Sequence, residues 1–479
     1  MSTAPEANAA PTKAPHKGNL LFLGLSQAFR MGAGFAISVM LMRLLGVEGF
    51  GVYAYVTTLV GLFGFGSHLG MNNLLNREIA RDHSLAERYV ATGLLSTTLL
   101  SVLTGLCIVA WAWLLDGRSL VVAAALVASV ALGLRSVAMM PVAAFHAVRR
   151  MGLGVQAHMV GRVVLVAFTA LFLWLQLDVV SVFMAQVIDG IVTLVLVALV
   201  FRKEIGALSM SASWVELRSM VRRSVPFGLN ALFGSIYLTV DVVMLQHFRG
   251  DAEVGEYRAA TMILSLLALI ADTFSQGLFP RMARHLGQPQ KAGEELRFAT
   301  RVLLALGLPA SVGGILLALP IMLLLGGQEY AGSATLFAVM APLVPLRFLN
   351  NSFSMTLSTL NRQSDRTKGV MLAAAFNVLA NLVALPHYGA LGAAVTTLLT
   401  ELLLGAWLRW RIQPLVSGLG LGGTLLRAAL PTAVMAGVLL LLPPMHVLLA
   451  IAAGALVFGI VGRLTGAWTM QDLRRLRRV

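Results

Sequence analysis

The sequence predicts an all-α, polytopic membrane protein of about 14 transmembrane helices, on three observations. The 479 residues are 58% hydrophobic and 12% charged, and soluble domains carry roughly twice that charged fraction. Apolar runs of about 20 residues recur almost from end to end, the length that crosses a bilayer as a helix. These runs do not alternate polar with apolar residues, so helices are expected rather than barrel strands.

The first part of the chain is expected to form a lobe of six helices. Residues 1–19, rich in Ala and Pro, predict a disordered cytoplasmic tail. The apolar run that follows is too long for a signal peptide and ends in no clean cleavage site, so it is interpreted as the first membrane helix. The spans expected within this lobe, residues 20–201, are 20–42, 52–75, 89–115, 119–146, 157–177 and 179–201.

A longer connection, residues 202–223, then predicts a cytoplasmic linker. Within it Trp214, Leu217 and Met220 share one helical face and Arg218 and Arg222 lie away from it, which is typical of a short amphipathic helix on a membrane surface.

The second part predicts another six-helix lobe, residues 224–410, two further helices within 411–463, and a basic cytoplasmic tail, 464–479. The expected spans are 224–246, 258–280, 302–325, 332–358, 369–386, 390–408, 428–443 and 446–462.

Lysine and arginine are distributed unevenly between the two sides of these spans. With a cytoplasmic N-terminus, four arginines fall in outer loops: Arg43, Arg118, Arg249 and Arg258. Four lie inside spans: Arg30, Arg135, Arg162 and Arg347. The other 28 of the 36 basic residues face the cytoplasm, which predicts that both termini are cytoplasmic. Membrane orientation therefore explains the net charge of +15 better than nucleic-acid binding does.

The sequence contains no signature of a soluble enzyme. It has no phosphate-binding glycine loop with lysine, no nucleophile elbow and no metal-spaced His/Cys cluster. The single cysteine, Cys107, excludes a disulfide framework and a thiolate cluster. We therefore expect a transporter without catalytic residues, metal or cofactor.

The two lobes are predicted to be diverged copies of one unit. "GFGVYAYVTTL" (49–59) resembles "EVGEYRAATMI" (253–263) at an offset of 204 residues. An offset of 212 aligns three further pairs: Arg135 with Arg347, Arg150 with Arg362, and Asp189 with Glu401. Because each copy holds an even number of helices, both enter the membrane in the same direction. This predicts parallel lobes around a central cleft, related by an axis along the membrane normal.

The stretch "SQAFRMGAGFAISVMLMRLLGVEGFGVYAYVTTLVGLFGFGSHLGMNNLLNREIAR" (26–81) resembles the opening of the Wzx-type oligosaccharide-lipid flippases of polysaccharide biosynthesis, in the multidrug/oligosaccharidyl-lipid/polysaccharide exporter superfamily. Residues 237–260 and 389–403 support the resemblance. It implies that the chain moves an undecaprenyl-diphosphate-linked oligosaccharide across the bacterial inner membrane, for O-antigen, capsule or exopolysaccharide synthesis. Membrane lipids and polysaccharide polymerase or assembly proteins are the other partners implied.

Three arginines are candidates for binding the substrate. Arg30, Arg135 and Arg347 each lie 11 residues from an end of an expected span, hence about 16 Å deep in a hydrocarbon core of about 30 Å. A cationic cavity is one explanation, since guanidinium groups match diphosphate oxygens. Helix-locking ion pairs are the alternative. Arg162, nearer the cytoplasmic end of its span, is expected to reach the membrane surface.

The intramembrane carboxylates are Asp189, Asp241, Asp272 and Glu401. Each is a candidate for pairing with an arginine or for coupling transport to a proton or sodium ion. The resemblance places an aspartate commonly at the position of Asp241. Asparagines in the spans, among them Asn350 and Asn351, suit either sugar hydroxyls or interhelical hydrogen bonds.

Four alternatives to an oligosaccharide flippase remain at this point. A multidrug/cation antiporter of the same superfamily would favour an acidic cavity. A peptidoglycan-precursor flippase has the same charge requirement and matches the opening helix less well. A membrane glycan polymerase would be an enzyme with a large external loop, and no predicted outer loop is that long. A transport-inactive assembly scaffold is the fourth.

Overall fold

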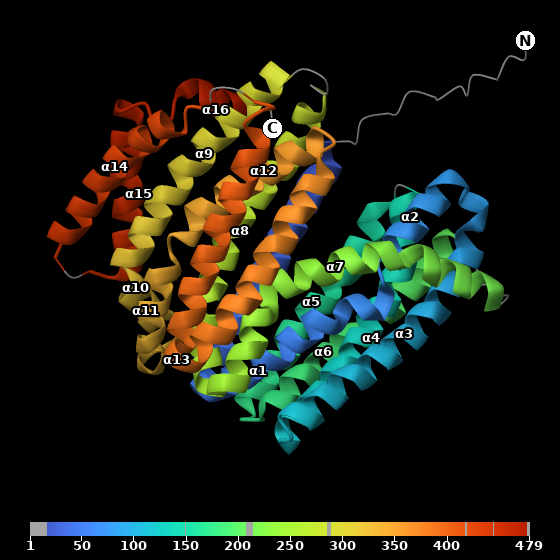
Figure 1. The fold of residues 1–479 in the computed structure, drawn as a ribbon. Coiled ribbons are helices and arrows are strands. Elements are labelled where there is room, and N and C mark those ends of the chain that lie inside the picture. The colour runs from blue at the N-terminus through green and yellow to red at the C-terminus, as the bar shows by residue number, and fades with distance from the viewer. Residues whose placement is uncertain are drawn as a thin grey trace, which may run out of the picture.

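The computed structural model describes residues 17–148, 150–206, 214–284, 289–416, 419–443 and 445–476. Throughout these ranges the chain is built from helices and forms no strand. Two groups of long helices meet at one end of the molecule and splay apart at the other (Figure 1). Most of the tail expected over 1–19 lies outside the described residues.

The N-terminal group contains six α-helices and a short 3₁₀ turn at His83–Leu85. Its helices are α1 (Lys17–His68), α2 (Met71–Arg81), α3 (Ala86–Leu115), α4 (Ser119–Ala147), α5 (Met151–Trp174) and α6 (Val179–Glu204).

The C-terminal group follows, with a 3₁₀ turn at Gln328–Tyr330. Its helices are α7 (Trp214–Arg249), α8 (Asp251–Ala283), α9 (Pro289–Leu316), α10 (Ala318–Gly326), α11 (Ala331–Met340), α12 (Leu343–Thr359) and α13 (Gln363–Ile412). The chain continues through α14 (Leu421–Leu441), α15 (Val447–Leu464) and α16 (Met470–Leu476).

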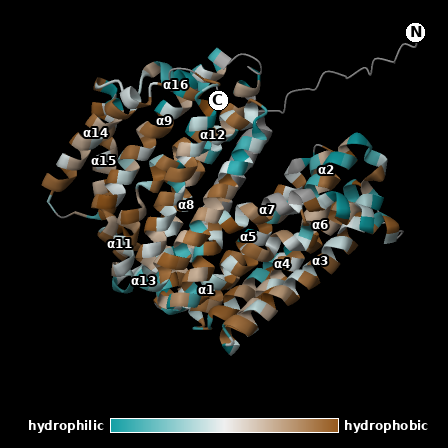
Figure 2. Cartoon of the chain, viewed as in Figure 1, coloured by the Kyte–Doolittle hydropathy of each residue, from teal (hydrophilic) through white to brown (hydrophobic). Residues whose placement is uncertain are grey.

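The outer faces of these helices are those of a multi-pass membrane protein. Figure 2 shows apolar residues along the helix lengths and hydrophilic residues gathered near α2 and α16. Large apolar side chains point outward, among them Leu106 at 63% exposure and Trp113 at 66%. Within the described ranges ten helices are long and apolar enough to cross a membrane, or eleven if the bent pair α11–α12 is one span.

This count is lower than the expected fourteen, partly because two of the ten helices are interrupted. The 52-residue α1 is broken at Gly46 and the 50-residue α13 at Gly389, both in the left-handed region with φ of 68° and 54°. At 1.5 Å per residue each is about twice the length a bilayer requires, so each can supply two crossings. The breaks coincide with the predicted loops after 42 and 386. The number fourteen itself stays a prediction.

Arginines support both breaks by binding backbone carbonyls that the helices leave free. Arg43 Nε donates to the Leu325 carbonyl at 3.1 Å, beside the break in α1. At the break in α13, which contains Pro386, Arg249 donates to the Leu385 and Pro386 carbonyls at 3.1 and 2.9 Å. Backbone carbonyls left without a helix partner at such ends and breaks need another donor, and the two arginines supply it.

The internal repeat is visible in the helix boundaries. Shifting the bounds of α4 by 212 residues gives Ala331 and Thr359, where α11 begins and α12 ends. The same shift moves the start of α5 onto Gln363, where α13 begins. α4 therefore corresponds to α11 and α12 together, and α5 and α6 to the two parts of α13.

α7 links the two groups, and it differs from the separate surface helix expected within 202–223. It runs without interruption from Trp214 to Arg249, contacting α1, α2 and α3 as well as α8 and α13. Leu217 and Met220, on the apolar face of the predicted helix, are buried at 7% and 3% exposure. Met220 belongs to a buried cluster with side chains of α2, α4 and α6. Trp214, the third residue of the predicted apolar face, is 70% exposed, so packing against protein accounts for only part of that face. Residues 207–213 of this connection lie outside the described ranges.

Candidate functional site

A cavity of 540 Å³ opens within the N-terminal group of helices, and two arginines give it a positive charge. Side chains of α1, α4, α5 and α6, with Ser235 of α7, line it. Arg135 and Arg162 both face this space, and no carboxylate is among its lining residues. We refer to it as the N-terminal cavity.

Arg135 reaches the cavity from the middle of α4, an otherwise apolar helix. One terminal nitrogen (Nη2) of its guanidinium group donates to the Gln186 side-chain oxygen on α6 at 2.9 Å, and its Nε donates to the Ala131 carbonyl at 3.3 Å. Both acceptors are neutral, and none of the ion pairs among the described residues includes Arg135. Its charge therefore remains available to a ligand.

Arg162 lies further along its helix than the sequence predicted. It was expected near the cytoplasmic end of a span beginning at 157, but α5 begins at Met151. Arg162 is therefore 11 residues into the helix, about 16 Å from its start. Its side chain lines the N-terminal cavity, which the sequence did not predict.

The remaining polar groups of the N-terminal cavity come mainly from the second part of α1. Thr57 and His68 line it together with the ring of Tyr53. His68 Nδ1 accepts a hydrogen bond from the Gly70 backbone at 3.0 Å, which leaves Nε2 for the cavity. The side chain of Arg30, the third arginine predicted to bind substrate, lies outside the part of the structure that describes side chains.

Arg347, the repeat counterpart of Arg135, has a different partner. Its Nε donates to the Glu401 carboxylate at 2.9 Å, so the two side chains form an ion pair between α12 and α13. Tyr237 of α7 and Asn350 of α12 donate to the same carboxylate at 2.7 and 2.8 Å. Glu401 is buried with its charge satisfied on three sides, and it neutralises Arg347.

Asp241 lies one helical turn from Tyr237 on α7, and it has no basic partner among the described residues. It is buried at 8% exposure, accepts from its neighbour's backbone at 2.9 Å, and accepts a short hydrogen bond from Tyr257 of α8. The Tyr257 hydroxyl also lies 3.3 Å from that of Thr397 on α13. This small polar network joins three helices of the C-terminal group.

The two other predicted carboxylates bind neutral groups. Asp189 accepts from Thr193 at 3.4 Å and packs against α5 at Gly161, where an added Cβ would lie 2.4 Å from it. Asp272 accepts a short hydrogen bond from Asn351. In the described part of the chain, no three His, Cys, Asp or Glu residues gather as a metal site would require.

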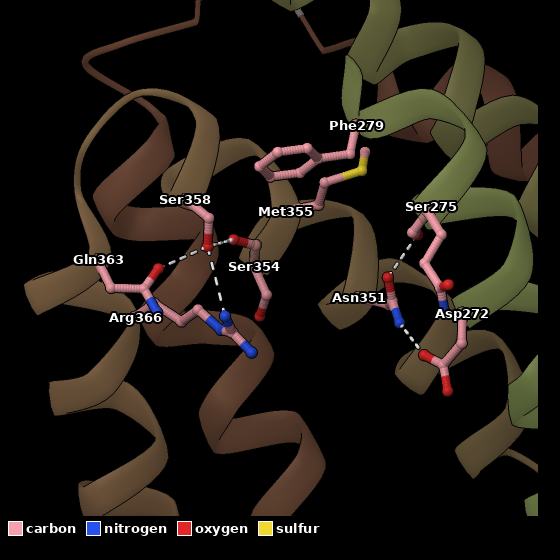
Figure 3. Close-up of a pocket in the computed structure, with 10 residues that line it drawn as sticks. Asp272, Ser275, Phe279, Asn351, Ser354, Met355, Ser358, Gln363 and Arg366 are labelled. Carbon is pink, nitrogen blue, oxygen red and sulfur yellow. Dashed lines mark hydrogen bonds between the residues drawn. The ribbon is translucent and has the colours of Figure 1, made fainter. Parts of the chain in front are cut away.

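Asp272 belongs to a second cavity, of 650 Å³, between α8, α12 and α13 (Figure 3). We refer to it as the C-terminal pocket. Asn351 donates to Asp272 and accepts from Ser275 on one side of the picture. Across the pocket the Ser358 hydroxyl lies between Gln363 at 2.8 Å and Arg366 at 3.4 Å.

Several members of these sites were not predicted from the sequence. Gln186, Tyr237 and Tyr257 were missed because a polar residue on a membrane helix has no distinctive spacing of its own. A signal was available for Tyr237, because it precedes Asp241 by four residues and so shares its helical face.

Comparison with protein families gives two matches. The model described as "Polysaccharide biosynthesis protein" matches residues 17–286, more than half of the chain. The model described as MatE matches residues 226–386.

Individual proteins agree with these matches. A putative O-antigen transporter of Escherichia coli K12 is 23% identical over 410 residues, which cover 80% of this chain and 94% of that protein. The probable flippase AglR of Haloferax volcanii is 27% identical over 239 residues, 47% of this chain and half the length of that relative. A solved structure of the lipid II flippase MurJ, in an inward closed conformation, has the same fold, with a TM-score of 0.79 at 13% identity, covering 95% of this chain and 100% of that one.

Proposed function

The chain belongs to the polysaccharide biosynthesis protein family, and from this premise we propose that it is a flippase for a lipid-linked oligosaccharide. The cargo would be an undecaprenyl-diphosphate-linked oligosaccharide, carried across the bacterial inner membrane for surface polysaccharide synthesis. Both termini would lie in the cytoplasm. The process is transport, with no covalent step assigned to any residue.

One observation carries the proposal: the N-terminal cavity holds two arginines without an ion-pair partner among the described residues. An isolated charge at membrane depth costs from about 2.5 to more than 10 kcal/mol, and such residues normally face a watery cavity and a functional ligand. A diphosphate is an anion whose oxygens fit guanidinium donors. The polyprenyl tail would stay in lipid while the diphosphate occupies the cavity.

The arrangement of helices suits alternating access. The two groups meet at one end and splay apart at the other (Figure 1), and rocking of two related lobes would exchange the open end. Asp241 is the candidate for coupling this motion to a proton or sodium ion, because it is buried and lacks a basic partner in the described structure.

A cation antiporter is the second candidate, supported by the MatE match over residues 226–386. Organic cations require acidic lining, and the charged residues that line the N-terminal cavity are both arginines. This charge balance favours the flippase.

Ligand binding to the full-length protein in nanodiscs tests the two candidates. We expect undecaprenyl diphosphate to bind and the organic cation tetraphenylphosphonium not to bind. Arg135→Gln and Arg162→Gln should each weaken diphosphate binding about 10- to 150-fold, as the loss of one charge-assisted hydrogen bond predicts. Arg427→Gln is the matched control, on an exposed position of α14 away from the cavity. If tetraphenylphosphonium binds and undecaprenyl diphosphate does not, the flippase proposal is wrong and the antiporter is favoured.

A further inference from the structure

The C-terminal pocket has the lining of a binding site for a neutral, hydroxyl-rich ligand. Its volume of 650 Å³ falls within the roughly 300–1,000 Å³ typical of small-molecule sites. Serine, asparagine and glutamine side chains supply both donors and acceptors, and one acid and one arginine balance in charge. The lining of the N-terminal cavity, with two arginines and no acid, is positively charged instead.

The hydrogen bonds within the pocket fix its polar groups for a ligand. Ser275 donates to the Asn351 side-chain oxygen and the Asn351 amide donates to Asp272. This relay orients the amide and uses one oxygen of the carboxylate. The other carboxylate oxygen has no hydrogen-bond partner among the described residues, and Asp272 is exposed to the pocket.

An apolar surface completes the lining. In Figure 3, Phe279 and Met355 lie between the Asp272 side and the Ser358 side of the pocket. Phe279 is 44% exposed. An exposed ring beside hydroxyls and a carboxylate suits a sugar, whose ring offers an apolar C–H face and hydroxyls around its edge.

The polar lining of the pocket follows one face of α12 and one face of α8. Arg347, Asn351, Ser354 and Ser358 follow each other at steps of four, three and four residues, and therefore lie on one face of α12. Asp272, Gln276 and Phe279 form the matching stripe on α8. The pocket-lining residues Asn351, Ser354 and Ser358 therefore extend for about 10 Å along α12, which leaves room for more than one sugar ring.

We propose that the C-terminal pocket binds sugar units of the lipid-linked oligosaccharide while the diphosphate occupies the N-terminal cavity. This inference rests on the proposed function and divides the substrate between the two sites by charge. An anionic phospholipid head group is the competing occupant through Arg366, but the Asp272 carboxylate in the same pocket would repel it.

Cysteine protection in nanodiscs tests the division, because Cys107 is the only cysteine of the chain. In a Cys107→Ser background, Gln276→Cys reports the C-terminal pocket and Thr57→Cys the N-terminal cavity. Two probes are compared: undecaprenyl diphosphate, and the undecaprenyl-diphosphate glycolipid fraction of the source cells' membranes. We expect both probes to slow maleimide labelling of Thr57→Cys. Only the glycolipid, and not undecaprenyl diphosphate, should slow labelling of Gln276→Cys, by at least about tenfold.

The outcomes separate the two claims. If neither probe protects Thr57→Cys, the flippase proposal fails. If the glycolipid protects Thr57→Cys and leaves Gln276→Cys unprotected, the sugar pocket is wrong while the flippase stands. Protection of Gln276→Cys by phosphatidylglycerol in sugar-free nanodiscs would assign the pocket to a lipid head group. In the same assay Asp272→Asn should weaken protection by the glycolipid at Gln276→Cys and leave protection of Thr57→Cys by undecaprenyl diphosphate unchanged.

Discussion

Gly51 and Gly255 hold equivalent places in the two halves of the chain and let the helices of those halves cross in backbone contact. A Cβ on Gly51 would lie 1.9 Å from the Asp251 carbonyl oxygen, and one on Gly255 would lie 2.2 Å from that of Val47. The offset between Gly51 and Gly255, 204 residues, also separates Val47 from Asp251. Each contact is therefore the symmetry mate of the other, so the repeat axis passes through this crossing.

The crossing predicts that small side chains are required at both glycines. Gly51→Ala and Gly255→Ala should each destabilise the protein by about 1–3 kcal/mol, the usual range for overpacking a close contact. Thermal unfolding of the purified protein in detergent measures the effect. Gly459→Ala is the control, because nothing lies within 4 Å of a Cβ at that position of α15. Equal stability of all three variants would mean that the helices do not meet here.

An ion pair holds the same end of the molecule together across the two groups of helices. Arg118, between α3 and α4, donates to the Asp251 carboxylate at 3.0 Å and also binds Asp116. Hydrogen bonds with Asp116 and then Asp251 hold the pKa of Arg118 above its ordinary value, so the guanidinium stays charged.

Reversing one charge of this pair should open the contact. Asp251→Arg places two like charges together. In a Cys107→Ser background it should raise the labelling rate of a cysteine introduced at Tyr55, which is buried at 3% exposure and lines the same cavity as Arg118. Adding Arg118→Glu restores opposite charges and should lower the rate again. Because the pair is partly exposed, we expect an effect of about 1 kcal/mol or less, equivalent to a rate change of up to about fivefold. No rescue by the double variant would contradict the pairing.

The position of Arg118 also bears on membrane topology, because residues 116 and 251 must lie on one side if one arginine binds both. The arginine count assigns that side to the exterior. Reporter fusions after residues 116 and 251 should therefore report the external side, and fusions after 83 and 212 the cytoplasm. The reverse pattern would invert the direction of transport proposed above.

The sequence predicted the helices and the repeat because both depend on local, periodic information. The apolar runs determined the spans, and the offset of 212 found from Arg135 and Arg347 reappears in the bounds of α4, α11 and α12. Charge asymmetry cannot show where a helix begins inside the protein, however. α5 starts six residues before the expected span, so Arg162 lies further along the helix than predicted, and it lines the cavity.

Side-chain partners could not be predicted, because equivalent residues of the two halves have different partners. The repeat aligned Asp189 with Glu401, which suggests the same role for both. Glu401 binds Arg347, whereas Asp189 accepts from Thr193 and leaves Arg135 to the neutral Gln186. The partner of Arg135, Gln186, lies three residues before Asp189, the position equivalent to Glu401. No sequence pattern indicates which of these two α6 residues Arg135 contacts.

Asp241 provides a test of coupling. If it carries the proton or sodium ion, Asp241→Asn should abolish stimulation of transport by an ion gradient while retaining binding of undecaprenyl diphosphate and protein abundance. Asparagine keeps the shape and one acceptor for Tyr257, so the fold should tolerate it. Tyr257→Phe is the companion variant, since it removes the hydrogen bond without removing the carboxylate. Gradient-driven uptake into proteoliposomes measures both, and full stimulation in Asp241→Asn would exclude this residue as the coupling site.

The last prediction concerns the two arginines that the repeat relates, which should respond differently to the same substitution. Arg347→Gln leaves Glu401 as a buried charge without its cation, and breaking a buried pair in this way typically costs about 3–5 kcal/mol. We expect loss of folded protein, with rescue by adding Glu401→Gln. Arg135→Gln orphans no charge, because its partners are an amide and a backbone carbonyl.

For Arg135→Gln we therefore expect normal abundance with failure to complement a flippase-deficient strain, and partial rescue by Arg135→Lys, which keeps the charge without the planar fork. Immunoblots of membrane fractions separate the two kinds of failure. The two responses differ because Arg347 already has a carboxylate partner and Arg135 has none. Arg347 stabilises the packing of its helices, and Arg135 is free to bind an anionic ligand. Full complementation by Arg135→Gln together with Arg162→Gln at normal abundance would remove the cationic cavity from the mechanism.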